Sequence, residues 1–457
     1  MPYADFREFL DVLRRSGELI DIDRPIDLFV DVARALKQSN VIDGPALMFR
    51  QNGTAFPLVG GVYSTRAKAL LAFQATEDAI FEKILHGLDH PIAPAIVADP
   101  APVHEVVLTG DDIDITQFPI PTYSPHDGGA YITPGIVVSK DPETGVRDIG
   151  HYRFMLIDRN TLSFFTQPFH RFGKHIIKSV AAGSVQQGAL VIGIDPVIAY
   201  SAQVQTSDAT DDWAVAGGLR GAPVALVRCK TVDLEVPATA EVVIEFEVDT
   251  EHRVSEGPLG EYTGYYTPSS DEPVARITAI THRRQPIFQA LLTGKPVTEN
   301  HILKQMTFEA SFYREIKRSF PTVRRVAMPP SGGVSFYTII QIEPRYAGEA
   351  RQAILAAMAS NQRPKWVIAV DPDIDITRSG EVEWALAFRV HPGRDVFVVD
   401  DLPAGPADPL NSDEPARAKR INAAIGIDAT RTFGAEFADV ADVPGWQEFD
   451  VPELRKR

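Results

Sequence analysis

Glu256-Gly-Pro-Leu-Gly-Glu261, followed directly by Tyr262-Thr-Gly-Tyr-Tyr-Thr-Pro268, interrupts a series of strand-like segments in the middle of the chain. Glycine and proline both oppose a helix interior, so this stretch predicts a turn of rigid, non-helical backbone that holds two carboxylates close together. Carboxyl groups in one site generally push each other's pKa values apart, which lets a proton donor stand beside a charged group. The residues alone leave two interpretations open: such a site, or an acidic surface turn in an acidic protein.

Short β-branched segments separated by Gly, Pro and Asp surround this turn, from about Glu105 to Gln289. The clearest of them are Gly135–Ser139, Ala189–Gly193, Pro223–Val227, Glu241–Glu247 and Arg276–Ile280. Strands this dense in turns predict a sheet or barrel-like middle domain.

The flanking regions alternate helical and strand-like patterns, which predicts α/β layers on both sides. Helices are expected at residues 6–16, 28–38, 77–85, 302–318 and 348–359, and strands at 46–49, 56–60, 337–342, 366–370 and 396–399. The Pro- and Ala-rich segment Pro91–Pro102 predicts a linker. We therefore expect a mixed α/β (α+β) fold with an N-terminal domain at 1–104, a middle domain at 105–290 and a C-terminal domain at 291–457, in keeping with the chain length.

The composition argues against several classes of partner. The net charge is −16, whereas sequence-independent nucleic-acid binding and anionic membrane surfaces both require clustered Lys and Arg. No apolar run is long enough to span a bilayer, and the N-terminus lacks the pattern of a signal peptide. We therefore expect a cytoplasmic protein that binds neither nucleic acid nor membrane. Cys229 is the only cysteine, which excludes an intramolecular disulfide and favours a packed strand residue over a nucleophile.

A second cluster of chemically active residues lies upstream, in Arg147-Asp-Ile-Gly-His-Tyr-Arg153 and Gln167-Pro-Phe-His170. Asp148 and His170 offer donors suited to a divalent cation, and Asp211 or Asp212 would supply a third ligand. The spacing is not a metal signature, and a lone histidine is more often a packed or surface residue. Arg153 is suited to a substrate carboxylate, a glutamate partner or a plain surface ion pair. Phosphate-loop, HExxH and GxSxG motifs are absent.

Motifs along nearly the whole chain resemble the UbiD family of reversible decarboxylases, which use prenylated FMN. The motifs that carry the resemblance are Asp148–Arg153, Pro168–His170, Leu234–Glu241, Glu256–Glu261, Glu383–Arg389 and Gly426–Thr430. The resemblance implies a flavin-binding split β-barrel as the middle domain and a C-terminal domain that contains a dimerisation segment. It therefore implies a homodimer or a higher homo-oligomer.

The same resemblance implies a set of cofactors and the residues that bind them. Prenylated FMN, supplied by a flavin prenyltransferase, would be anchored through a divalent ion, usually Mn²⁺, together with K⁺. The metal ligands carried over are Asp148, His170 and Asp212, of which the two aspartates replace the family's usual Asn and Glu. The cofactor-binding residues carried over are Asp148, Ile149, Arg153, Phe169, His170 and Arg389.

The family's catalytic Arg-Glu-Glu set maps onto Arg153, Glu256 and Glu261. Side chains supply no electron sink for decarboxylation, so the cofactor must, through a covalent adduct with the substrate. The resemblance implies that Glu261 protonates the carbon that loses CO₂ and that Glu256, paired with Arg153, stays ionised and orients substrate and cofactor.

The substrate is the least specified element. By alignment from Glu299, Asn300 and His301 fall where relatives contact the substrate ring, and Tyr262, which follows Glu261, would form an aromatic wall of the pocket. An amide and a histidine favour a heteroaromatic acid such as a pyrrole or indole carboxylate, while hydroxybenzoates and cinnamate-like acids stay open. Alternatively, His301 packs at a helix start.

Two other functions compete with the decarboxylase. The replaced ligands Asp148 and Asp212 motivate a cofactor-free assembly or binding protein. The same aspartates with His170 would serve a metal-dependent hydrolase, although the chain offers no evident open metal site for one.

Overall fold

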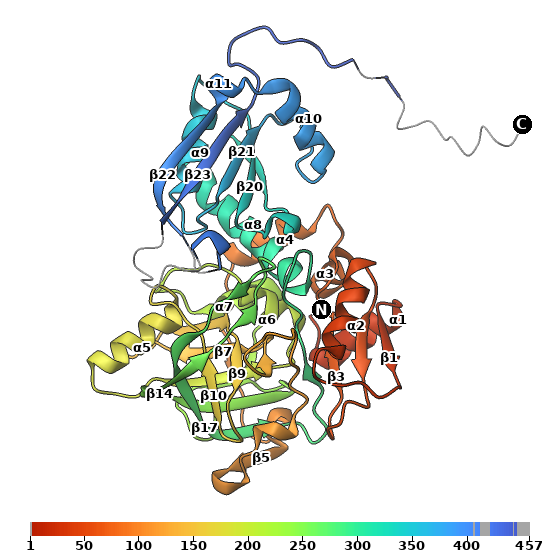
Figure 1. The fold of residues 1–457 in the computed structure, drawn as a ribbon, viewed down its shortest axis with the longest axis vertical. Helices are drawn as coiled ribbons and strands as arrows, with labels where there is room; N and C mark the ends of the chain where they lie inside the picture. The colour runs from red at the N-terminus through yellow and green to blue at the C-terminus, as the bar shows by residue number, and fades with distance from the viewer. Residues whose placement is uncertain (1, 405–406, 412–420, 442, 446–457) are drawn as a thin grey trace, which may run out of the picture.

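A computed structural model describes residues 2–404, 407–411, 421–441 and 443–445. The middle of the chain forms a curled sheet at the bottom of Figure 1, the first helices and strands lie beside it, and a smaller α/β unit stands above it. The end of the predicted C-terminal domain, at residues 446–457, lies outside the described residues.

The N-terminal region packs four helices around a small sheet, as the alternating pattern predicts. Its helices are α1 (Phe6–Arg15), α2 (Asp31–Val41), α3 (Arg66–Phe73) and α4 (Ile80–Asp89), and its strands are β1 (Leu19–Ile22), β2 (Ala46–Phe49) and β3 (Leu58–Gly60). The sheet order is β1-β2-β3-β18, so β18 (Phe288–Gln289), which comes from the far end of the predicted middle domain, completes it. Helix α1 begins at its cap Asp5, whose side chain accepts a hydrogen bond from the Glu8 amide.

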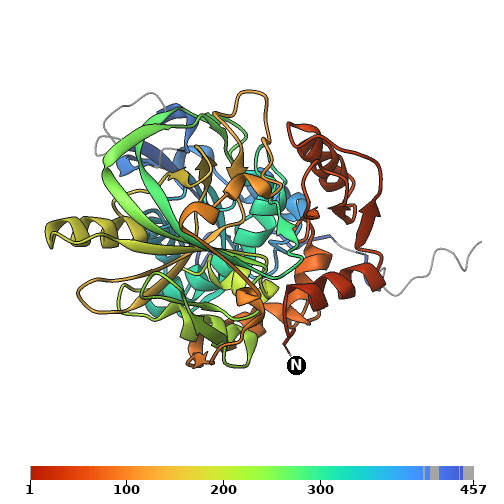
Figure 2. The same cartoon turned by 90° about the horizontal axis from the view of Figure 1, so that it is seen from below.

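The middle region is dominated by a nine-stranded sheet whose order along the main path is β6-β9-β10-β17-β14-β11-β7-β8, with β5 paired to β17. Its strands are β5 (Val106–Thr109), β6 (Tyr131–Ile132), β7 (Ile136–Lys140), β8 (Arg147–His151), β9 (Phe154–Leu156), β10 (Thr161–Phe164), β11 (Gln187–Ile192), β14 (Val242–Glu256) and β17 (Ser270–His282). Register shifts interrupt the antiparallel pairing of β14 with β17, and such bulges increase the bend and twist of a strand. The sheet curls into a half-barrel, visible from below in Figure 2, which confirms the barrel-like prediction.

Smaller elements attach to this sheet. They are the helices α5 (Arg171–Ala181), α6 (Pro196–Ser201) and α7 (Asp212–Arg220), the strands β4 (Ala95–Ile96), β12 (Ala225–Arg228) and β13 (Glu235–Pro237), and the hairpin strands β15 (Leu259–Gly260) and β16 (Tyr266–Thr267). Strand β4 pairs in parallel with β12. The segment predicted as a linker therefore contributes a strand to the middle region.

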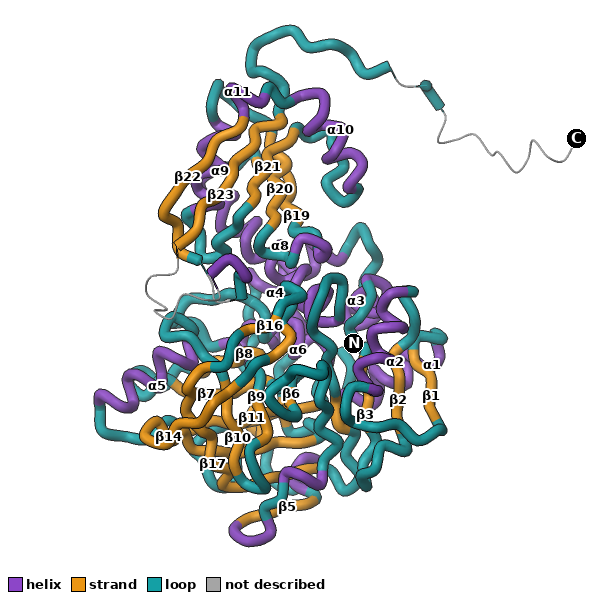
Figure 3. The backbone as a smooth tube through the Cα atoms, in the orientation of Figure 1, coloured by secondary structure: helices purple, strands orange, loops and turns teal. Residues whose placement is uncertain are grey.

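The C-terminal region is a five-stranded sheet of order β19-β20-β21-β23-β22, with helices packed against it (Figure 3). Its elements are α8 (Glu299–Ser319), β19 (Val323–Ala327), β20 (Tyr337–Ile342), α9 (Glu349–Met358), β21 (Trp366–Val370), α10 (Ser379–Arg389), α11 (Pro392–Asp395), β22 (Val396–Pro403) and β23 (Ile421–Ala429). Helix α8 runs between this sheet and the lower part of the molecule (Figure 1). In the described part of the chain no helix has the length and apolar character needed to cross a bilayer.

Helix α8 is fixed at its first residue by the N-terminal region. The buried carboxylate of Glu299 accepts hydrogen bonds from the amides of Gly61 and Tyr63, each at 2.9 Å. The ring of Tyr63 contacts Tyr200 of α6, with centroids 5.5 Å apart. The three regions thus meet at the start of α8, which sets the position of the side chains that follow on this helix.

Candidate active site

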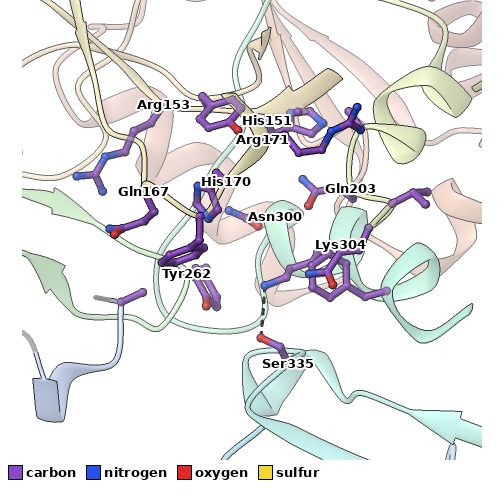
Figure 4. Close-up of a pocket in the computed structure, with 18 of the residues that line it drawn as sticks. His151, Arg153, Gln167, His170, Arg171, Gln203, Tyr262, Asn300, Lys304 and Ser335 are labelled. Carbon is purple, nitrogen blue, oxygen red and sulfur yellow. Dashed lines mark hydrogen bonds between the residues drawn. The ribbon is translucent and has the colours of Figure 1, made fainter. Parts of the chain in front are cut away.

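A cavity of about 880 Å³ lies between the curled sheet and the C-terminal region, and it falls within the size range of small-molecule and cofactor sites. Its walls come from β8, the segment that leads into α5, the hairpin after β14, one face of α8, and residues 335–336 and 361–363. Figure 4 shows polar side chains from these elements around the cavity.

The turn that opened the sequence argument forms one wall of this cavity. Glu256 is the last residue of β14, and Glu261 directly follows the short strand β15. The chain passes closely beneath the turn at Gly128, where a Cβ atom would stand 2.1 Å from the Gly257 carbonyl oxygen. Only glycine fits there, so the backbone of residues 256–261 is held in place by a neighbouring loop.

Arg153 joins the two glutamates. Its Nε and Nη2 donate to the two carboxylate oxygens of Glu256 at 3.0 and 2.7 Å, a bidentate pair, while Nη1 donates to Glu261. Glu256 is fully buried, whereas the Glu261 side chain is 18% exposed and lines the cavity. The structure therefore brings together the three residues predicted as catalytic, and it gives the two acids different surroundings.

The electrostatics of this set favour a permanently charged arginine. Burial alone would lower the pKa of Arg153, but the charges of Glu261 and Glu256 outweigh this effect and raise it. The guanidinium also lies over the Phe165 ring, 4.7 Å from its centroid. One cation thus faces two acids, and only one of these acids can be reached from the cavity.

A second charged cluster forms where β8, α5 and α7 converge. Arg171, the first residue of α5, places Nη1 2.7 Å from Asp212 and 3.3 Å from Asp148. Asp212 also accepts from the Thr206 hydroxyl and the Ile149 amide. Burial and the charge of Asp212 raise the pKa of Asp148 well above its usual range, and burial also raises the pKa of Asp212. Arg171 was not singled out from the sequence, although it directly follows His170.

The predicted three-ligand metal group does not form in this arrangement. Asp148 and Asp212 are drawn together around Arg171, and one buried oxygen of Asp148 has no hydrogen-bond partner. Within the described residues no three His, Cys, Asp or Glu side chains are arranged to hold a metal ion. His170 instead caps α5 and faces the cavity beside the exposed ring of Phe169. The reason is the guanidinium, which occupies the space between the carboxylates.

Helix α8 supplies the opposite wall. Asn300, Lys304 and Phe308 follow one another at four-residue spacing, so they lie on one face of the helix, and all three line the cavity. The ammonium of Lys304 lies 4.6 Å from the centroid of the Tyr262 ring and 4.5 Å from that of Phe308. Asn300 and Tyr262, both predicted as substrate-pocket residues, thus line the cavity. Lys304 was missed, although the helical spacing from Asn300 points to it.

His301 does not reach the cavity, contrary to its prediction as a substrate-pocket residue. It is fully buried, its Nδ1 accepts from the Thr298 amide at 3.1 Å, and its Nε2 donates to the Tyr262 carbonyl at 2.6 Å. Both ring nitrogens are therefore taken by backbone groups. The alternative of a histidine packed at a helix start is the one that the structure supports, and the ring also tethers the segment that carries Glu261.

Arg389, which the sequence predicts to bind the cofactor, does not line the cavity. It ends α10, and its buried guanidinium donates to Asp371 and Asp373 at 2.7–2.9 Å, just after β21. Of the described residues that line the cavity, none belongs to α10. Arg389 therefore stabilises the C-terminal sheet and its covering helix, away from the walls of the cavity.

Comparison with known proteins agrees with this architecture. The 3-octaprenyl-4-hydroxybenzoate carboxy-lyase family matches in three parts: its N-terminal domain at residues 10–88, its Rift-related domain at 95–296 and its C-terminal domain at 301–429.

Solved structures match over the full length. The UbiD-class enzyme HmfF from Pelotomaculum thermopropionicum, in complex with FMN, is 32% identical, with a TM-score of 0.89 over 98% of this chain and 99% of that chain. An evolved dimeric form of the same enzyme, in complex with prFMN, is 32% identical, with a TM-score of 0.87 over 99% and 100%. Vanillic acid decarboxylase from Sedimentibacter hydroxybenzoicus in its closed form is 28% identical, with a TM-score of 0.90 over 100% and 99%.

The matched family and the full-length structural matches, with the same curled sheet beside an α/β unit, define the class of this chain as a carboxy-lyase. The chain belongs to the UbiD family, as the resemblance of its motifs implied.

Proposed function

We propose that this chain catalyses the reversible, non-oxidative decarboxylation of an aromatic or heteroaromatic carboxylic acid with prenylated FMN, and that Glu261 is the proton donor. The observation that carries the proposal is the unequal environment of two acids on one arginine: Glu256 is fully buried, whereas Glu261 faces the cavity. Such a pair separates a fixed charge from a group that is free to exchange a proton with a ligand.

The cavity fits a flavin. It is large enough, and it combines aromatic surfaces with cationic and amide groups from several elements. Arg153, the Ile149 backbone, Phe169, His170 and Arg171 would hold the cofactor. When bound, prenylated FMN supplies the electron sink that decarboxylation requires and that side chains lack.

Each member of the Arg-Glu-Glu set then has a distinct task. Glu256 holds the guanidinium of Arg153 through two hydrogen bonds and fixes its plane. Arg153 in turn fixes the Glu261 carboxyl at the cavity wall. In decarboxylation, protonated Glu261 delivers its proton to the substrate carbon that has lost CO₂, and the resulting carboxylate takes a new proton from solvent before the next turnover. In carboxylation, the Glu261 carboxylate takes the proton of the ring C–H.

The residues predicted to bind a metal ion are already occupied by a cation of the protein. The Asp148 and Asp212 pair with one unpartnered oxygen is an oxygen-donor set suited to a hard cation such as Mn²⁺ or K⁺. Arg171, however, already balances much of the charge of both carboxylates. We therefore derive no chemical step through a metal ion.

The decisive experiment is purification after co-expression with a flavin prenyltransferase, followed by a panel of aromatic acids. We expect a coloured protein that exchanges the hydrogen of the product ring carbon with solvent deuterium and releases CO₂ from an aromatic acid. A colourless protein without flavin absorption would contradict the enzyme and favour a cofactor-free binding protein.

The assembly of the chain belongs to the same proposal. The C-terminal region exposes large apolar side chains, among them Phe388 at 70% exposed and Val398 at 58%. On α10 the ring of Phe388 lies beside that of the partly exposed Trp384, with centroids 6.1 Å apart. Adjacent exposed apolar groups of this kind are found at interaction surfaces, which supports a homodimer or higher homo-oligomer formed through this region. Light scattering coupled to gel filtration measures the mass directly, and a monomer at working concentrations would contradict this part.

A further inference from the structure

A loop at residues 124–128 runs beneath the turn that carries Glu256 and Glu261, and it contains a carboxylate that the mechanism above leaves unused. This group is Asp127, which is partly buried. Asp127 does not belong to the described residues that line the cavity, so it stands outside the cavity wall. Its role must therefore be sought in its contacts with the turn.

Both carboxylate oxygens of Asp127 accept hydrogen bonds from backbone amides. Oδ1 accepts from Gly260 at 3.0 Å, and Oδ2 accepts from Ser124, within its own loop, at 2.8 Å. Hydrogen bonds from an amide to an ionised carboxylate are about twice as strong as those between neutral groups. Asp127 thus ties the residue directly before Glu261 to a loop that the same side chain holds together.

The Gly260 amide lies on the outer edge of the hairpin that carries the acid. Strand β15 pairs with β16 in an antiparallel sheet of two strands, and the Glu261 amide donates to the Tyr265 carbonyl within this hairpin at 2.9 Å. Successive amides of an extended segment point to opposite edges, so the Gly260 amide points away from β16. Asp127 accepts it there, where a third strand would otherwise stand. The backbone at Glu261 is therefore held from both edges of the hairpin.

This support matters because the turn has little rigidity of its own. Two of its six residues, Gly257 and Gly260, are glycines, which leave an unsupported backbone unusually free. Arg153 fixes the carboxyl of Glu261 but does not fix the backbone from which the side chain projects. A proton donor must come within hydrogen-bond reach of its target, and a displacement of about 1 Å costs about 100-fold in rate.

We propose that Asp127 is a positioning residue for the proton donor, because its hydrogen bond to the Gly260 amide fixes the backbone from which Glu261 reaches the cavity. The inference rests on the proposed function for the role of Glu261, whereas the tether itself can be measured without turnover. In this arrangement Asp127 holds the backbone of the donor and Arg153 holds its carboxyl.

The tether is tested by backbone hydrogen–deuterium exchange, followed by mass spectrometry on the full FMN-loaded chain. Asp127→Ala leaves the Gly260 amide without its acceptor, so peptides within residues 256–266 should exchange about 10- to 100-fold faster, the range for a hydrogen bond to a charged group. Asp127→Asn keeps one oxygen for this amide and should restore most of the protection. Unchanged exchange in Asp127→Ala would overturn the tether.

The positioning role is tested by turnover of the prenylated-FMN form. We expect kcat per bound flavin to fall about 10- to 100-fold in Asp127→Ala while KM and flavin content stay near those of wild type, because binding is intact and the donor is displaced. Asp127→Asn should recover a large part of kcat. A merely structural role would lower the flavin content or raise KM and leave kcat per bound flavin unchanged. That result, or normal turnover, would overturn the proposal.

Asp114→Ala is the matched control. Asp114 caps the 3₁₀ helix Ile115–Gln117 of the same region by accepting a hydrogen bond from the Thr116 amide at 3.0 Å, and it does not line the cavity. This variant removes the same kind of carboxylate from another loop. It should leave both the exchange of residues 256–266 and the turnover unchanged.

The two experiments separate this inference from the proposed function. If wild type decarboxylates no aromatic acid, the proposed function and the role of the donor fall together, while faster exchange in Asp127→Ala would still establish the tether. If Glu261→Gln is inactive and Asp127→Ala turns over like wild type, the proposed function stands and the positioning role falls.

Discussion

The two walls of the cavity differ in whether their cations are paired with carboxylates of the protein. On the middle-domain wall, Arg153 is already bound by Glu256 and Glu261 before any ligand arrives, and the turn that carries the acids is fixed by a neighbouring loop. On the α8 wall, Lys304 lies against aromatic faces with only a hydroxyl beside it. A preorganised charge set suits chemistry that is the same for every substrate, whereas an unbalanced cation suits selection among substrates. The comparison predicts that changes on the first wall stop the reaction and that changes on the second alter its specificity.

The largest effect is expected from Glu261→Gln. The amide keeps the size of the side chain and one acceptor for Arg153, but it cannot deliver a proton. We expect turnover to fall by at least the factor typical of a lost general acid, about 10²- to 10⁴-fold, with flavin content unchanged. Activity and visible absorption of the same preparation check both parts. Near-normal turnover would show that Glu261 is not the proton donor.

The charge set of the first wall should also contribute to stability. Arg153→Met leaves the buried Glu256 carboxylate without a cation, which costs about 3–5 kcal/mol of folding free energy. The double change Arg153→Met with Glu256→Met removes both members of the pair and should recover most of this loss, although neither variant should turn over substrate. Thermal midpoints measured side by side check this. A double variant as unstable as the single one would show that the pair is not the cause.

His170 and Arg389 offer a sharper contrast, because both were predicted to bind the cofactor. His170→Ala removes a side chain from the cavity wall, and we expect most of the flavin to be lost on purification. Arg389→Gln disturbs an ion pair with Asp371 and Asp373, and we expect the flavin content per folded protein to stay that of wild type. Absorption spectra normalised to protein concentration check both. Loss of flavin from Arg389→Gln would show that Arg389 contributes to flavin binding.

The structural features that the sequence predicts are those whose physical signal lies in neighbouring residues of the chain. Glycine and proline mark the turn of Glu256 and Glu261, and short apolar runs predict β2, β20 and β21 at their observed bounds. The approach of Arg153 to acids more than a hundred residues away was available only from the motif resemblance. Strand pairings between regions, such as β18 with β3, follow from tertiary packing and carry no local signal.

The errors at the site have equally physical causes. His301 and Lys304 are three residues apart on α8, and helical spacing from Asn300 selects Lys304 as the residue that shares its face. The alignment with the family, counted from Glu299, instead placed His301 together with Asn300 in the substrate pocket. Arg171 was not predicted as a site residue, because nothing in the sequence shows that its guanidinium contacts both Asp148 and Asp212. For the same reason the metal group was predicted as three ligands around an ion.

The pH dependence of aromatic-acid binding gives the finest test of the second wall. Burial lowers the pKa of Lys304 to about 8, against the opposing effect of the Glu261 charge. The ammonium is therefore charged below about pH 8 and is lost as the pH rises further, so the affinity for the acid should fall by up to about tenfold per pH unit above that point. Of the other groups near Lys304, burial raises the pKa of Tyr262 and lowers that of His301 to about 4, so neither ring changes its charge in this range.

Calorimetric titrations of an aromatic acid into the FMN-loaded protein from about pH 6 to 10 measure this decline, because FMN without the prenyl group leaves the acid unreacted. Lys304→Arg, whose guanidinium stays charged, should hold its affinity for the acid across the range. A parallel decline in Lys304→Arg would place the titrating group elsewhere in the cavity. The α8 wall would then have no greater part in selecting the substrate than the wall that carries Glu261.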